Sequence, residues 1–216
     1  MKPRIKICCI SSIEEAMTAI EAGASAIGLV GKMPGGPGVI PDELICRIAK
    51  SIPPPVATFL LTSETSSAGI IRHHEATQTN TIQMVDKLIC GSFQQIRESL
   101  PAIKLVQVIH VMDENSVDEA IEVSQFVDAI LLDSGNPNLP VKELGGTGRV
   151  HNWKLSRKIR DRVKIPVFLA GGLNPWNVRI AIEEVEPFGI DVCSGVRTNG
   201  KLDKNKLELF MNALNF

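Results

Sequence analysis

Two side chains in this sequence have the chemistry of a general base and a general acid. Cys8 lies near the end of an apolar run that begins at Arg4, and Asp133 directly follows the apolar residues Ala129–Leu132. A thiol with a lowered pKa acts as a base or a nucleophile. A carboxyl group that is partly desolvated has a raised pKa, which suits it to donate a proton. The alternatives are a buried, inert cysteine and an aspartate that only braces its loop.

Two glycine-rich segments have the composition of phosphate-binding loops. One contains Gly171-Gly172 and the other contains Ser194-Gly195, and an apolar run precedes each of them. Glycine lets backbone amides approach an anion, and the N-terminus of a following helix adds partial positive charge. Either segment alone could be an ordinary tight turn. Two such segments after successive strands favour a phosphate site.

The residues around Cys8 make further expectations possible. Successive residues of a strand face opposite sides, so we expect only one of Cys8 and Cys9 to point inwards. Lys6 lies two residues before Cys8 and is therefore expected on the same face of the strand. Its charge needs a partner, for which Asp133 is one candidate. An ordinary ion pair in the core would explain Lys6 equally well.

These side chains must be positioned by an alternation of short apolar runs and segments with helical periodicity. Helical spacing is found in Ser12–Ala22, Val117–Phe126 and Asn174–Val185, and Asp203–Leu214 is expected to form a closing helix. Ser12, Ser92, Ser116 and Asn174 have the sequence context of helix N-caps. The apolar runs, expected to be strands buried on both faces, are Arg4–Ile10, Ala26–Gly31, Val56–Thr62, Thr81–Val85, Lys104–Val111, Asp128–Ser134, Ile165–Gly171 and Gly189–Gly195.

Eight β-α units predict an α/β protein with a single (β/α)8 TIM barrel over residues 1–216. In such a barrel ligands bind at the C-terminal ends of the strands, where Cys8, Asp133 and both glycine segments fall. The alternative is an open, doubly wound sheet. It usually has five or six strands and a Gly-x-Gly-x-x-Gly turn after the first, whereas here Ser11-Ser12 follow the first run.

The composition narrows the class of protein. Hydrophobic residues make up 44% and charged residues 22%, with a net charge of -1, which excludes a disordered chain. There is no basic excess to attract nucleic acid or an acidic membrane, and no apolar run is long enough to span a bilayer. Five cysteines without Cys-x-x-Cys spacing and only four histidines argue against a disulfide framework and a metal site. We therefore expect a reduced, cytoplasmic protein that binds neither nucleic acid nor membranes.

Several motifs, spread over essentially the whole chain, resemble those of the phosphoribosylanthranilate isomerase family of tryptophan biosynthesis. They are Lys6-Ile7-Cys8, Leu131-Leu132-Asp133-Ser134, Gly145-Gly146-Thr147-Gly148 with Trp153, Ala170-Gly171-Gly172-Leu173-Asn174-Pro175, and Gly189-Ile190-Asp191-Val192 with Ser194-Gly195-Val196. The resemblance implies an Amadori rearrangement of a phosphoribosyl amine, from aldose to ketose, without cofactor or metal. It also implies a phosphorylated small-molecule substrate and a monomer or homodimer.

The resemblance assigns roles by motif. Cys8 would be the general base, and Asp133 the general acid that helps to open the ribose ring. The phosphate would lie on the loops at Gly171-Gly172 and Ser194-Gly195, with Gly146, Thr147 and Gly148 closing over the pocket and Asp191 nearby.

The sequence departs from the family pattern where the aromatic acid would bind. Cys9 replaces the usual glycine, and Gly36-Pro37-Gly38 replaces Ser-Pro-Arg, whose arginine holds the anthranilate carboxylate. Loss of such a charged partner typically costs about 1.5–3 kcal/mol. Arg149 or Arg197 could supply a relocated cation. The alternative is therefore a divergent paralogue that acts on, or merely binds, another phosphorylated sugar-amine.

Overall fold

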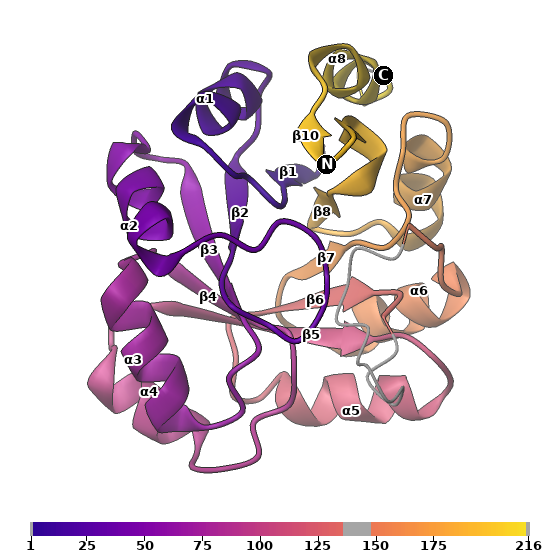
Figure 1. Ribbon diagram of the computed structural model, residues 1–216. Coiled ribbons are helices and arrows are strands. Elements are labelled where there is room, and N and C mark those ends of the chain that lie inside the picture. The colour runs from indigo at the N-terminus through magenta and orange to yellow at the C-terminus, as the bar shows by residue number, and fades with distance from the viewer. Residues whose placement is uncertain (1, 136–147, 215–216) are drawn as a thin grey trace.

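Eight parallel strands close into a barrel in the order of the chain, with helices outside (Figure 1). The computed structural model describes residues 2–135 and 148–214. The barrel strands are β1 (Arg4–Ile7), β2 (Ala26–Val30), β3 (Ala57–Thr62), β4 (Thr81–Met84), β5 (Lys104–His110), β6 (Ala129–Asp133), β7 (Val167–Leu169) and β8 (Gly189–Val192). The α-helices are α1 (Ile13–Glu21), α2 (Asp42–Ser51), α3 (Ser67–Thr77), α4 (Phe93–Ser99), α5 (Asn115–Val123), α6 (Trp153–Arg162), α7 (Val178–Val185) and α8 (Lys204–Asn212).

Closure of the barrel confirms the predicted TIM barrel and excludes the open sheet. Ile7 of β1 is in register with Ile27 of β2 on one side and with Val192 of β8 on the other. No edge therefore remains between the first and last barrel strands. The predicted apolar runs extend past several strand ends because buried loop residues are as apolar as the strands.

The strands are apolar on both faces because the barrel has two layers of packing. In β2, Ile27 and Leu29 belong to the core between barrel and helices, whereas Ala26 and Val30 belong to the barrel interior. All five residues of this strand are buried. This is why the strands appear in the sequence as continuous apolar runs rather than as an alternating pattern.

Two of the predicted helix caps are confirmed and two are wrong. Ser12 and Ser92 accept hydrogen bonds from the first turns of α1 and α4. Ser116 lies inside α5, and its hydroxyl group bonds to the loop before that helix. Helix α7 begins at Val178, with Asn177 as its N-cap residue. The side-chain oxygen of Asn174 instead accepts hydrogen bonds from the backbone N–H groups of Trp176 and Asn177, in the turn before the helix.

A short hairpin after β8 was not predicted. The 3-10 turn η1 (Ser194–Val196) leads into the two-stranded sheet of β9 (Arg197–Thr198) and β10 (Lys201–Leu202). Asn199 and Gly200 form its tip with φ angles of 50° and 77°. An Asn-Gly pair is the usual sequence signal for such a tight turn, so this element was readable from the sequence.

Across residues 2–135 and 148–214, no helix has the length and apolar character required to cross a membrane.

Candidate active site

A pocket opens where the strands of the barrel end. Its walls include Cys8 after β1, Asp133 at the end of β6, Gly171-Gly172 after β7, and Asp191 in β8. The structure thus brings the two candidate acid–base groups and one glycine segment, which are far apart in the sequence, to a single site.

Cys8 and Cys9 both face this pocket, so the expectation that only one of them points inwards is wrong. Strand β1 ends at Ile7, and Cys9 adopts a left-handed conformation with φ of 61°. The alternation of faces holds only within an extended strand. Both cysteines are buried among the residues of the barrel interior.

Cys8 occupies a space that the neighbouring strand leaves open. A Cβ atom at Gly28 of β2 would lie 2.8 Å from Cys8 Sγ and 3.0 Å from Lys6 Nζ. The thiol and the ammonium group therefore converge on the same point of the barrel, and only glycine leaves room for both.

Lys6 forms an ion pair with Asp191, not with Asp133. Its Nζ atom donates a hydrogen bond to Asp191 Oδ2 at 2.8 Å, and both side chains are buried. Burial alone would lower the pKa of Lys6, but the charge and hydrogen bond of Asp191, together with the neighbouring thiols of Cys8 and Cys9, outweigh burial and the pKa is raised. The sequence alone missed this pair because Asp191 follows Lys6 by 185 residues and only barrel closure makes β1 and β8 neighbours.

Asp133 has the environment that a general acid requires. Its carboxyl group is buried, and burial raises its pKa, although the backbone N–H of Ser134 donates a hydrogen bond to Oδ1 at 2.7 Å. The nearby charge of Asp191 raises this pKa further. The group is therefore protonated to a higher pH than an ordinary aspartate.

The two glycine segments pack against each other. Gly171 and Gly172 have φ angles of 82° and 64°, which favour glycine. A Cβ atom at Gly195 would lie only 2.1 Å from the carbonyl oxygen of Leu173, so this contact also requires glycine. Gly148 lies on the same side, since a Cβ atom there would be 3.7 Å from Ser194 Oγ. Gly146 and Thr147 lie outside the described residues.

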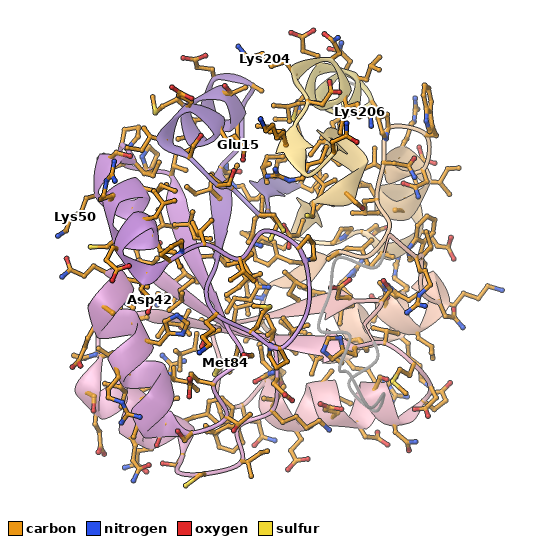
Figure 2. All side chains as sticks on the ribbon, viewed as in Figure 1. Glu15, Asp42, Lys50, Met84, Lys204 and Lys206 are labelled. Atoms are coloured by element: carbon orange, nitrogen blue, oxygen red, sulfur yellow. The ribbon has the colours of Figure 1, made fainter. Side chains whose placement is uncertain are left out.

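Arg197 is not a relocated cation for the substrate. Its Nη2 atom donates a hydrogen bond to the carbonyl oxygen of Cys8 at 2.9 Å, and the guanidinium group forms an ion pair with Glu15 of α1. Figure 2 shows Glu15 extending from α1 toward the β9–β10 hairpin. There its carboxylate also accepts a hydrogen bond from the backbone N–H of Leu202. Arg197 thus braces the backbone of the candidate base, a role that the sequence did not suggest.

Two of the departures from the family pattern are in direct contact. A Cβ atom at Gly38 would lie 2.5 Å from Cys9 Cβ. A side chain at position 38 is therefore incompatible with Cys9 as it stands, and the two differences form one structural change. Among the described residues that line the pocket there is no lysine or arginine.

Fold and pocket together define the class: a (β/α)8-barrel protein with a thiol, a buried carboxyl group and a glycine-lined loop at the strand ends. Comparison with known proteins agrees with this class. The family profile described as N-(5'phosphoribosyl)anthranilate (PRA) isomerase matches residues 5–213. The chain belongs to the N-(5′-phosphoribosyl)anthranilate isomerase family.

Individual relatives match over nearly their whole length. N-(5'-phosphoribosyl)anthranilate isomerase 2 of Methanosarcina mazei is 35% identical over 97% of this chain and 92% of its own. The crystal structure of the isomerase from Thermotoga maritima superimposes with a TM-score of 0.82 at 31% identity, covering 98% of both chains. A crystal structure of such an isomerase in complex with reduced 1-(o-carboxyphenylamino)-1-deoxyribulose 5-phosphate gives a TM-score of 0.79 at 30% identity, again over 98% of both chains.

Proposed function

We propose that this chain catalyses the Amadori rearrangement of N-(5′-phosphoribosyl)anthranilate to the corresponding 1-amino-1-deoxyketose phosphate. Its family membership supports this activity. The observation that carries the proposal is the presence of Cys8 and Asp133 in one pocket beside the backbone of Gly171-Gly172. Neither the family match nor the structural relatives favour another aglycone.

Asp133 donates the first proton in this proposal. Protonation of the ribose ring oxygen allows the C1′–O bond to break while the amine nitrogen forms the C1′=N double bond. A buried carboxyl group with a raised pKa keeps its proton at neutral pH more readily than an exposed one.

Cys8 then removes the proton from C2′. The electron pair of that C–H bond forms the C1′=C2′ double bond of an aminoenol, which becomes the ketose when C1′ is protonated. Lys6 places a positive charge beside the thiol, and Arg197 holds the carbonyl group of Cys8 itself. Both contacts keep the base at a fixed position against the substrate.

The substrate phosphate binds on the loops at Gly171-Gly172 and Ser194-Gly195 in this proposal. Three features support the assignment: the positive φ angles, the contact between the two loops, and the position of Gly148 next to Ser194. By motif, we assign Gly146 and Thr147, which lie outside the described residues, to the same function. Asp191 holds Lys6 through their ion pair.

We also propose that the partner of the protein is this phosphorylated small molecule, not nucleic acid or membrane, and that the protein works in the cytoplasm as a monomer or homodimer. A structural relative from Thermotoga maritima is described as a dimeric isomerase from which monomers were generated.

The test is complementation of a tryptophan-requiring strain that lacks this isomerase, together with kinetics of the purified protein. We expect the wild-type chain to restore growth. Cys8→Ala and Asp133→Asn should each lower kcat by about 100-fold or more, the usual share of a general acid or base. Cys46→Ala in α2 and the exposed Asp118→Asn in α5 are matched controls outside the pocket and should retain activity.

Full activity in both pocket variants would refute the assigned roles. Binding of an anthranilate-bearing product analogue to wild-type protein separately tests the aglycone. Turnover of a different phosphoribosyl amine without such binding would instead support the paralogue.

A further inference from the structure

Three cysteines meet at the pocket, and the mechanism uses only one of them. Besides Cys8, the pocket wall contains Cys9 and Cys193. The sulfur atoms of Cys9 and Cys193 lie 2.8 Å apart. The proposed proton transfers and phosphate binding do not use this contact.

The pairing of β1 with β8 and the left-handed turn at Cys9 together bring the two thiols into contact. Cys9 follows β1 and Cys193 follows β8, and these strands are paired with Ile7 opposite Val192. The backbone N–H of Cys8 extends this ladder with a hydrogen bond to the carbonyl oxygen of Val192 at 2.9 Å. Barrel closure therefore brings the ends of β1 and β8 side by side, and the left-handed backbone of Cys9 turns its thiol toward Cys193.

The two thiols differ in reactivity. The hydrogen bond with Cys9 lowers the pKa of Cys193, and the positive charge of Arg197 contributes in the same direction, although burial opposes both. The same contact, a further hydrogen bond with Cys8 and burial raise the pKa of Cys9. Since the thiolate is the reactive form, Cys193 is the sulfur that reacts first.

We propose that Cys9 and Cys193 form an oxidisable dithiol site at the catalytic pocket, which hydroperoxides convert into a disulfide that stops catalysis. With hydrogen peroxide, the Cys193 thiolate attacks one peroxide oxygen, so that an S–O bond forms, the O–O bond breaks and hydroxide leaves as water after protonation. Cys9 then attacks the sulfenic sulfur of Cys193: the S–S bond forms, the S–O bond breaks, and the hydroxide that leaves takes up the Cys9 proton as a second water. The two sulfurs lose two electrons in total, and the peroxide gains them.

The disulfide would disturb both halves of the site. Cys9 is the neighbour of the proposed base Cys8, and Cys193 is the neighbour of Ser194 in the proposed phosphate loop. Bond formation draws the two sulfurs closer than 2.8 Å and so displaces the backbone on either side. Small displacements of catalytic groups cause large losses of rate. This loss of activity rests on the proposed function, whereas formation of the disulfide does not.

The experiment treats the full chain with one equivalent of hydrogen peroxide, blocks remaining thiols with iodoacetamide, and maps tryptic peptides by mass spectrometry. We expect peptide 7–32, with Cys8 and Cys9, to be joined to peptide 180–197, with Cys193. Isomerase activity should fall at least tenfold and return after dithiothreitol. Cys46 and the exposed Cys90 lie on other peptides and serve as internal controls.

Variants identify the sulfurs involved. Cys8→Ala should retain the cross-link, because Cys8 is not part of the pair. Cys9→Ser and Cys193→Ser should both lose it, with each variant compared with its own untreated sample and its folding checked by circular dichroism. Folded variants that resist peroxide would assign the inactivation to this pair.

The absence of the cross-link from oxidised wild-type protein would overturn the proposal, as would its persistence in Cys9→Ser. A cross-linked protein with full activity would overturn the effect on catalysis. If the untreated protein has no isomerase activity, the proposed function fails, but the cross-link still decides whether the dithiol site exists.

Discussion

His151 gives the stability of this protein a defined dependence on pH. Its Nε2 atom lies 2.7 Å from the hydroxyl oxygen of Ser156, which is completely buried. Nδ1 is also buried and has no partner in the described part of the chain. Burial lowers the pKa of His151 from its ordinary 6.5 to about 4.

The sign and the size of the effect follow from this shift. The folded state binds the proton more weakly than the unfolded state, so the contribution is fully present above pH 6.5 and is lost as the pH falls toward 4. With about 1.4 kcal/mol per pKa unit, the loss is about 2 kcal/mol at pH 5 and about 3 kcal/mol at pH 3.

The assay is urea denaturation of wild-type protein and His151→Gln at pH 7 and pH 5. Glutamine does not titrate, yet it can keep a hydrogen bond to Ser156. We expect the free energy of unfolding to fall by about 2 kcal/mol more in wild type than in the variant, because all other titrating groups are shared. Equal losses in the two proteins would show that His151 is protonated in the folded state and would refute the reasoning.

Three further predictions concern the pocket. Lys6→Met should destabilise the protein by about 3–5 kcal/mol in urea denaturation, since Asp191 then stays buried without its partner; a cost near zero would mean that solvent reaches the carboxylate. Gly38→Arg alone should lower the melting temperature, because its Cβ atom meets Cys9 and position 38 has a φ angle of 79° that favours glycine. Adding Cys9→Gly should restore only the part that comes from the contact; strictly additive effects of the two substitutions would contradict the coupling. The rate should decline as the pH rises through the raised pKa of Asp133, and Asp191→Asn should move this limb to lower pH because a nearby negative charge is lost; an unmoved limb would assign it to another group.

Much of the fold was readable from the sequence for a local reason. Strands that are buried on both faces appear as continuous apolar runs, and the eight runs fall in the order in which the barrel closes. The cap residues of α1 and α4 were also predictable, because a serine at the start of a helix accepts a hydrogen bond from a backbone N–H group only three residues further on. Asn174 and Ser116 were mispredicted because the same side chains bond equally well within loops.

The candidate site was predictable in part. The barrel rule that ligands bind at strand ends selected Cys8, Asp133 and Gly171-Gly172, and all of them line the pocket. The orientation of Cys9 was not predictable from the sequence. The alternation of side chains between two faces ends with the strand, and the chain turns at Cys9 with a φ angle of 61°.

The sequence by itself determined the barrel, the family and the residue types available for acid–base chemistry, because periodicity and motifs are local properties of the chain. Only the tertiary structure decided which of those groups meet. Lys6 with Asp191, Arg197 with Glu15 and Cys8, and Cys9 with Cys193 are all separated by more than 180 residues. Their contacts exist because the last strand closes against the first, and no local pattern in the sequence encodes the distance between two residues that only barrel closure brings together.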